Sequence, residues 1–302
     1  MSDQFIIRTL DGEGGSATIS DYGAHVLRWA PAGQPDVVWQ PSAVYLSEGT
    51  AIRGGVPIVF PWFNSGYDPE PDGTDNGRTA SRTPKHGFAR TSFWHRDESA
   101  SPIDDDGNAV ARYTLDSTEA DEATLAQFVG NPHPRFHAVY EVRSGSTLTM
   151  AFTVTNDGDA PFSYETALHT YLHVGDVEHV EVTGLDGTEY LDNTVSGFPV
   201  CAQHGPIRFD GSMVDRIYLS DHEIEVHDER LDRTIVATSH GANTTVVWNP
   251  GESAGNAIGD LADGEWRGFV CVEAAANRAN LITLNPGESH TIAQTLSVLQ
   301  KL

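Results

Sequence analysis

The sequence predicts an all-β protein, built from antiparallel sheets that pack as a large sandwich. Short β-rich runs separated by turn signals recur from one end of the chain to the other. Within residues 146–156, large apolar side chains alternate with small or hydroxyl-bearing ones, and this period of two is typical of a strand with unlike faces. No long segment shows the helical period. The best helical candidate, residues 117–128, is short and lies between β runs.

The expected strands follow one another at short intervals, with turns rich in Gly, Pro, Asn and Asp between them. Residues 99–108 fit a hairpin tip. Residues 64–84 form a long loop, which is either functional or a mobile excursion. The β-rich runs are 16–30, 36–40, 111–115, 138–157, 179–185, 233–240, 244–250, 268–273, 281–289 and 290–299.

The length of the chain fits one domain of this kind. Two average domains could share 302 residues, but large β architectures use this length for one, and no linker separates regions of different composition. Apolar residues make up 39% of the chain, with 6 Trp, 9 Tyr and 12 Phe, which is enough for a sizeable core. We therefore expect residues 1–302 to form a single sandwich domain.

Charge and cysteine content argue against several classes of protein. The formal net charge of −25 disfavours a nucleic-acid partner, because phosphate backbones are bound by basic groups. The first residues show no leader pattern, and no apolar run approaches the roughly 18 residues that span a bilayer. Cys201 and Cys271 are too few for a disulfide framework. We therefore expect a monomeric cytoplasmic protein without nucleic-acid or membrane partners.

Two titratable side chains in apolar, strand-like runs are the candidates for catalysis. His169 lies in the run ETALHTYLHV, and Glu273 lies in FVCVEAAAN. Alternation places His169 on the same strand face as Tyr171, and Glu273 on the same face as Cys271. A carboxylate at the rim of an apolar wall has a raised pKa and is a better base. The pair suggests a proton donor and a proton acceptor facing one another across a pocket, although a hydrogen-bonded core histidine is an open alternative.

Positive charge gathers in one part of the chain. Five of the 18 basic residues fall within 38 positions, namely Arg53, Arg78, Arg82, Lys85 and Arg90. Arginine forks and the amides of a Gly-Gly turn suit a phosphate monoester, which needs several donors that converge on one dianion. A solvated patch that balances acidic neighbours is the alternative. The apolar, glycine-containing surroundings of Arg53, Lys85 and Arg90 favour anion binding.

Metal binding is the obvious competitor in a chain with 13 histidines. His169 and His173 have the HxxxH spacing, but the Glu of the HExxH metalloprotease signature is absent. No P-loop or strand-borne GxGxxG occurs, so a nucleotide site has no support. We therefore expect neither a metal nor another cofactor.

Several motifs resemble those of the glucose-6-phosphate 1-epimerases, or D-hexose-6-phosphate mutarotases, within the wider aldose 1-epimerase group. They occur in the family's order, and the final LNPGESHTIAQTLSVL is similar to the family's closing turn and strand. The matching motifs are RGGVPIVFPWF (53–63), KHGFAR (85–90), ETALHTYLHV (165–174), VTGLDGTEYLD (182–192), VDRIY (214–218), VVWNP (246–250) and FVCVEAAAN (269–277).

The resemblance implies a β-sandwich of the galactose mutarotase type and an isomerase that interconverts the α and β anomers of a hexose 6-phosphate without a cofactor. It places His169 on the general acid and Glu273 on the general base. Lys85 departs from the family, which more often has Gln there, and adds a charge near the phosphate. The substrate positions that the resemblance implies, with the arginines at the phosphate, are Arg53, Lys85, His86, Arg90 and Asp215.

Two other functions remain open from the sequence. One is a non-catalytic carbohydrate-binding sandwich, in which aromatic residues stack on a sugar ring unless they belong to the core. The aromatic candidates are Trp62, Phe63, Phe88 and Trp94. A mere binder does not require both His169 and Glu273. The other function is a mutarotase for unphosphorylated aldoses, for which the basic residues should be dispensable.

Overall fold

A computed structural model describes residues 5–70 and 79–300 of the chain. Within these residues, every pair of named strands is antiparallel. None of the helices described is long and apolar enough to cross a bilayer. The helices are short: α1 (Glu122–Leu125), α2 (Gly251–Gly255), and the 3₁₀ turns η1 (Ala89–Thr91), η2 (Ser117–Glu119), η3 (Val177–His179), η4 (Glu265–Gly268) and η5 (Arg278–Asn280). The prediction of an all-β antiparallel protein is confirmed.

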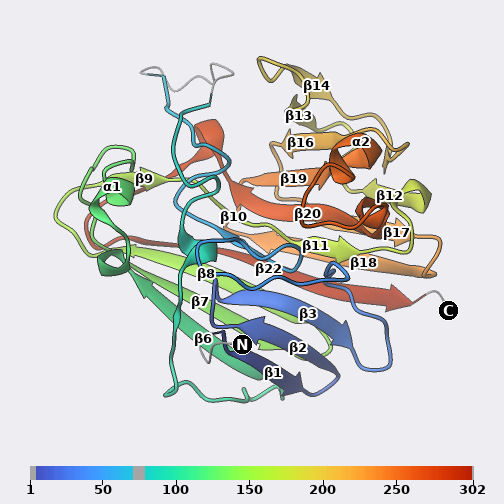
Figure 1. Cartoon of the computed structure of the whole chain (residues 1–302), viewed down its shortest axis with the longest axis horizontal. Coiled ribbons are helices and arrows are strands. Elements are labelled where there is room, and N and C mark those ends of the chain that lie inside the picture. Colours follow the sequence, from blue (N-terminus) through green and yellow to red (C-terminus); the bar gives the residue numbers. More distant parts are fainter. Residues whose placement is uncertain (1–4, 71–78, 301–302) are drawn as a thin grey trace.

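One layer of the sandwich is a nine-stranded sheet (Figure 1). Its strands lie in the order β15 (Ile207–Arg208), β12 (Val180–Thr183), β17 (Ile224–Asp228), β18 (Arg233–His240), β22 (Ser289–Gln300), β8 (Leu148–Asn156), β7 (Phe136–Ser144), β6 (Ala109–Asp116) and β5 (His95–Arg96). In β8 the even-numbered residues are buried, whereas the intervening residues are only partly covered. On that outer face, the Thr149 hydroxyl lies 3.0 Å from that of Thr295, and the Thr153 hydroxyl 2.7 Å from that of Thr291. The predicted alternation is therefore present, with hydroxyl pairs linking neighbouring strands.

The other layer is an eight-stranded sheet that positions the site. Its strands are β14 (Val200–Ala202), β13 (Glu189–Asp192), β16 (Val214–Tyr218), β19 (Thr244–Asn249), β20 (Phe269–Ala276), β10 (Thr166–Leu168) and β4 (Ile58–Val59), with β11 (Tyr171–His173) also paired to β20. All residues of β20 are buried. Val270 and Val272 belong to the main core, whereas Cys271 packs in a separate aromatic cluster on the opposite face. This strand therefore has two covered faces, which explains its continuous apolar sequence.

The two layers meet through a shared core and one polar link. Phe60, which follows β4, contacts the rings of Phe136 and Phe152 from the nine-stranded sheet at centroid distances of 5.2 and 5.5 Å. Gln294 of β22 donates a hydrogen bond of 3.0 Å to the Val272 carbonyl of β20. Figure 1 shows β20 lying over β22, in agreement with these contacts. The outer face of the eight-stranded sheet is thereby left for loops and for a ligand.

Two small sheets complete the structure. Strands β1 (Ile7–Gly12), β2 (Gly15–Ser20) and β3 (His25–Pro31) form one sheet, whose β1 and β2 contact β6 and β7, and β9 (Phe162–Tyr164) pairs with β21 (Ile282–Leu284).

Two local predictions were wrong. Residues 36–40 form no strand, only an isolated bridge at Val38, because the amides of Val37 and Val38 both bond to Trp29 after β3 ends. The helix expected over 117–128 is reduced to η2 and α1.

Candidate active site

Strand register brings His169 and Glu273 together. Strands β10 and β11 pair with the same strand, β20, in one continuous register. That register places His169, which lies in the gap between β10 and β11, opposite Glu273. Their side chains project to the same face of the sheet, and the His169 Nε2 lies 3.5 Å from the Glu273 Oε1. The two candidate proton carriers thus face one another, close enough to exchange a proton.

Burial favours the neutral form of both groups. Only 8% of His169 and 1% of Glu273 is exposed. Burial, together with the nearby charges of Arg90 and Arg53, lowers the pKa of His169 to about 3. Burial raises the pKa of Glu273 well above its ordinary value, and the carboxylate of Asp215 adds to this while Arg90 opposes it. In the ligand-free site, burial therefore favours a pair with one proton, held on Glu273 and not on His169.

The pair also has unused hydrogen-bonding capacity. The His169 Nδ1 and the Glu273 Oε2 are both buried, and neither has a hydrogen-bond partner among the described residues. A buried polar atom without a partner costs about 1–3 kcal/mol. Hydroxyl groups of a ligand would remove this cost, so the pair is suited to bind and to exchange protons with an alcohol or a hemiacetal.

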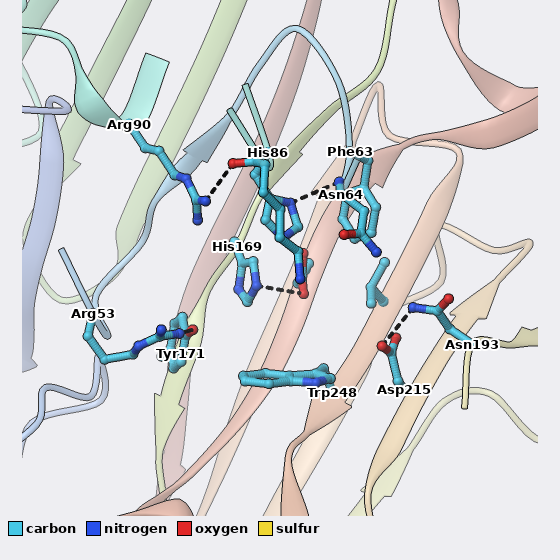
Figure 2. A pocket seen from close by; sticks show the side chains of 13 residues that line it. Arg53, Phe63, Asn64, His86, Arg90, His169, Tyr171, Asn193, Asp215 and Trp248 are labelled. Carbon is cyan, nitrogen blue, oxygen red and sulfur yellow. Dashed lines mark hydrogen bonds and ion pairs between the residues drawn. The ribbon is translucent and has the colours of Figure 1, made fainter. Parts of the chain in front are cut away.

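The pair lies in an open cavity of about 180 Å³ on the outer face of the eight-stranded sheet (Figure 2). All seven site residues predicted from the sequence line this cavity, although they come from segments between residues 53 and 273. The lining residues are Arg53, Phe63, Asn64, Lys85, His86, Arg90, His169, Tyr171, Asn193, Asp215, Val246, Trp248 and Glu273. Basic side chains, carboxyl groups and a tryptophan ring therefore line the same cavity.

Arg53 reaches the cavity from a tight glycine turn before β4. Its Nε donates to the Asp260 Oδ1 at 3.0 Å, and its Nη1 donates to the Tyr171 hydroxyl at 3.1 Å. Gly55 has a φ of +65°, and a Cβ there would lie 2.4 Å from the Val26 carbonyl oxygen. The Gly-Gly turn is thus required for the close approach of β3, and the two hydrogen bonds fix the guanidinium of Arg53 beside the cavity.

Arg90 is a buried cation of the site that lacks a carboxylate partner among the described residues. Its Nη2 donates to the Lys85 carbonyl at 2.6 Å, and its buried Nε has no hydrogen-bond partner among the described residues. No carboxylate in that part of the chain forms an ion pair with it. Burial lowers the pKa of Arg90 to about 10, to which the charge of Arg53 contributes. Such a guanidinium next to exposed Lys85 favours binding of an anion.

His86 is held as a neutral hydrogen-bond donor. Its Nδ1 accepts a hydrogen bond of 3.1 Å from the Asn64 amide, and its own amide donates to the Asn64 carbonyl at 2.6 Å. Because Nδ1 accepts, the ring proton of the neutral form lies on Nε2. Burial lowers the pKa of His86 well below its ordinary value. The residue has a φ of +64°, a strained conformation for a histidine that fits a functional position.

The far side of the cavity is suited to sugar hydroxyl groups. The Asp215 Oδ2 accepts a hydrogen bond of 2.7 Å from the Asn193 side chain, and burial raises the pKa of Asp215 to about 6. Asp215 lies opposite Trp248 in the register of β16 and β19. Figure 2 shows the indole of Trp248 as a flat surface below His169. A carboxylate beside an aromatic surface can hold the polar edge and the apolar face of a pyranose.

Glu165 ties together the segments that hold the site. Only 3% of it is exposed. Its Oε1 accepts from the Arg278 amide at 2.7 Å, just beyond β20, and its Oε2 accepts from the Phe63 amide at 3.3 Å. Glu165 itself begins the segment that contains His169. One buried carboxylate therefore joins the chain around Phe63, the His169 segment and the end of the strand that holds Glu273.

Some predicted features lie elsewhere. Arg82 forms an ion pair with Asp68 and donates to the Gln127 carbonyl, and it does not line the cavity. Arg78 and the middle of the long loop, residues 71–78, lie outside the described residues. His173 bonds to the Asp36 carbonyl at 3.0 Å. In the described residues, no group of three or more His, Cys, Asp or Glu side chains is arranged to hold a metal.

The aromatic residues proposed for sugar stacking divide into two groups. Trp62, Phe88 and Trp94 are buried in the protein interior, and the indole of Trp94 donates to the Ala89 carbonyl at 2.9 Å. Phe63 lines the cavity. Sequence reasoning did not select Trp248, although it lies in a quoted motif and two residues after Val246, which faces Glu273 across the register of β19 and β20. Alternation along β19 could have identified it.

The fold and sequence match known proteins along nearly the whole chain. The model of the family "Aldose 1-epimerase" matches residues 6–297. A protein of Cenchrus ciliaris named "Putative glucose-6-phosphate 1-epimerase" is 32% identical over 276 residues, 90% of this chain and 78% of that protein. A crystal structure from Salmonella typhimurium titled as a putative mutarotase superposes with a TM-score of 0.83 and 28% identity, covering 100% of this chain and 92% of that one.

A more distant structure shows the same fold. The galactose 1-epimerase of Lactobacillus acidophilus superposes with a TM-score of 0.70 and 14% identity, covering 99% of this chain and 95% of that one. The predicted sandwich of the galactose mutarotase type is thereby confirmed. With the family model matching almost every residue, this chain belongs to the aldose 1-epimerase family.

Proposed function

We propose that this protein interconverts the α and β anomers of a hexose 6-phosphate, with glucose 6-phosphate as the first candidate. The observation that supports this most is the buried pair of His169 and Glu273 in a cavity that also holds the uncompensated Arg90. A proton-transfer pair suits hemiacetal chemistry, and a converging set of cations suits a phosphate dianion. The glucose-6-phosphate 1-epimerase names of its relatives agree with both.

The reaction needs two proton transfers at a hemiacetal. Glu273 as carboxylate takes the proton of the anomeric hydroxyl, and His169 as imidazolium gives one to the ring oxygen. The bond between C1 and the ring oxygen breaks, and C1 becomes an aldehyde. Rotation about C1–C2 turns the other carbonyl face toward the ring hydroxyl, and both transfers then run in reverse. The pair ends with the single proton it started with, and each group contributes roughly 10² to 10⁴ in rate.

The same arrangement gives each part of the substrate a place. The phosphate binds to Arg53 and Arg90, with Lys85 at the exposed edge. The pyranose lies over Trp248, and its hydroxyl groups bond to Asp215 and to the Nε2–H of His86. No cofactor takes part in these steps, since the protein has only to take and give protons while the hemiacetal opens and closes. The cytoplasmic location and the monomeric state stay predictions.

The proposal is tested by exchange NMR on the two anomers of free and phosphorylated sugars. We expect the protein to accelerate anomer exchange of glucose 6-phosphate far more than that of glucose or galactose at equal concentration. Arg90→Gln should remove most of this preference, because it removes a charge at the phosphate. The exposed Arg208→Gln, on the distant strand β15, is the matched control and should behave as the wild type. No acceleration with any hexose phosphate would contradict the proposal.

One observation favours a second candidate, a mutarotase for unphosphorylated aldoses. Arg53 already has a carboxylate partner in Asp260, at 3.0 Å, so part of its charge is compensated before a ligand binds. In that case glucose or galactose would be the faster substrate, and Arg90→Gln would leave its rate unchanged. A non-catalytic carbohydrate binder has less support, because it does not explain why a buried carboxyl and imidazole with unsatisfied atoms face one another.

A further inference from the structure

The anion site and the proton-transfer pair are joined by direct contacts. The Nη1 of Arg53 donates to the hydroxyl of Tyr171 at 3.1 Å. The ring of Tyr171 lies nearly parallel to the imidazole of His169, with centroids 5.0 Å apart and an interplanar angle of 10°. The Nε2 of His169 in turn lies 3.5 Å from Glu273. Only the side chains of Arg53 and Tyr171 therefore separate an anion bound at Arg53 from the pair.

The cations act on the two members of the pair unequally. Figure 2 shows Arg53 and Arg90 on the His169 side of the cavity, and Asp215 on the opposite side. In the ligand-free site, the charges of Arg90, Arg53 and Lys85 all oppose protonation of His169. Of these three, only Arg90 has a resolved effect on Glu273. Whatever neutralises the cations thus favours a proton on His169 over a proton on Glu273.

We propose that the phosphate group of the substrate activates the proton-transfer pair, by driving the pair's one proton from Glu273 to His169 when it binds at Arg53 and Arg90. This inference rests on the proposed function. The O–H bond of the Glu273 carboxyl breaks, and an N–H bond forms at His169. The phosphate supplies charge alone and forms no covalent bond.

This transfer would resolve an apparent conflict in the site. The mechanism requires a carboxylate and an imidazolium, whereas burial in the ligand-free site favours a carboxylic acid and a neutral imidazole. A dianion on the His169 side offsets the cations and attracts the imidazolium, and charge interactions are strong where solvent is excluded. The phosphate is therefore expected to raise kcat as well as affinity. Binding energy that stabilises the bound substrate and the transition state equally would raise affinity alone.

The decisive experiment separates the sugar from the phosphate. Anomerisation of glucose by the intact protein is measured with and without phosphite dianion, after subtraction of the rate without protein. We expect phosphite to increase kcat/KM for glucose by about tenfold or more, the effect of one pKa unit. Arg90→Gln should abolish the increase, whereas Arg208→Gln should retain it. Phosphite that inhibits turnover of glucose 6-phosphate, and so binds, but leaves the glucose rate unchanged would overturn the inference while the proposed function stands.

A second measurement does not depend on the glucose rate. In protein labelled with ¹⁵N-histidine, the His169 signals are assigned by comparison with His169→Asn and followed as phosphite or glucose 6-phosphate is added. We expect the ring nitrogens to shift from the neutral to the imidazolium pattern on saturation. A neutral pattern that persists with glucose 6-phosphate bound and turning over would overturn the inference. Absence of any turnover of glucose 6-phosphate would instead contradict the proposed function.

Tyr171→Phe tests the contact path. The variant keeps the ring parallel to His169 and removes the hydroxyl that receives the hydrogen bond of Arg53. We expect a smaller phosphite activation and a lower kcat for glucose 6-phosphate, with a smaller loss of kcat/KM for glucose alone. Equal losses with both substrates would show that Tyr171 merely supports the site and would contradict a role in activation.

Discussion

The floor and the cationic wall of the cavity are built in different ways. The floor consists of strand residues, Glu273, Trp248 and Asp215, together with His169 in the gap between β10 and β11, and strand register fixes their neighbours. The wall, with Arg53 and the 85–90 segment, consists of loops with left-handed backbone and the first residues of the 3₁₀ turn η1, which contains Arg90. Under the proposed function, the sheet residues position the proton chemistry, whereas the residues of the wall select the anion. This division is common in enzymes whose loops vary on a constant scaffold.

The two regions also differ in how they compensate charge. On the floor, burial favours the neutral forms of His169 and Glu273. On the wall, Arg90 keeps its charge without a carboxylate partner among the described residues. The floor should therefore determine whether any sugar is turned over, and the wall should determine which sugar. Substitutions in the two regions test this distinction.

The largest effect should come from the floor. His169→Asn and Glu273→Gln each remove a group that exchanges a proton with the substrate, so kcat for glucose 6-phosphate should fall by roughly 10² to 10⁴. Both glucose and glucose 6-phosphate should be affected. Polarimetry of freshly dissolved α anomer gives the rate, and thermal unfolding shows whether the fold persists. A folded variant with a near-normal rate would exclude that residue as a proton carrier.

A smaller and more selective effect is expected on the wall. Arg90→Gln loses charge-assisted hydrogen bonds to the phosphate, which are worth about 1.5–3 kcal/mol. That corresponds to a fall of roughly 10- to 100-fold in kcat/KM for glucose 6-phosphate, with a small change for glucose. Steady-state kinetics on both sugars measures the ratio. Equal losses on the two sugars would break the proposed distinction between wall and floor.

Glu165 beneath the site should show its effect in stability. Burial raises the pKa of Glu165 to about 7, above the ordinary value of 4.5. Between these pH values the folded state binds more protons than the unfolded state, so this residue makes stability fall as pH rises from about 4.5 through 7. In Glu165→Gln that contribution is absent. The variant also places an amide donor against a backbone N–H. Its free energy of unfolding at pH 5 should therefore be about 1–3 kcal/mol lower than that of the wild type. Urea unfolding at several pH values measures both effects.

Lys85→Gln should give the smallest change. Lys85 is exposed at the edge of the cavity, so solvent weakens its interaction with a phosphate. We expect KM for glucose 6-phosphate to rise a few-fold at low salt, with kcat almost unchanged. The difference between wild type and variant should shrink as salt is added. A large fall in kcat would show instead that Lys85 touches the reacting part of the sugar.

The sequence allowed most of the floor to be predicted. Alternation along two apolar runs selects His169 and Glu273, and the same rule applied to β19 would have selected Trp248. The partner strands could not be derived in this way, because which strands pair depends on contacts far apart in the chain. The loops were harder still. Arg82 and Arg90 belong to one basic cluster in the sequence, where only the apolar, glycine-containing surroundings of Arg90 and the KHGFAR motif separate them. In the structure Arg82 bonds to Asp68 and Gln127, whereas Arg90 lines the cavity.

The most direct test of the account is a crystal structure of Glu273→Gln with glucose 6-phosphate bound. The account predicts the phosphate at Arg53 and Arg90, the ring oxygen within about 3.2 Å of the His169 imidazole, and the anomeric hydroxyl at the same distance from the side chain at 273. A sugar that binds with its anomeric carbon turned away from His169, or with its phosphate at Asp215, would contradict it.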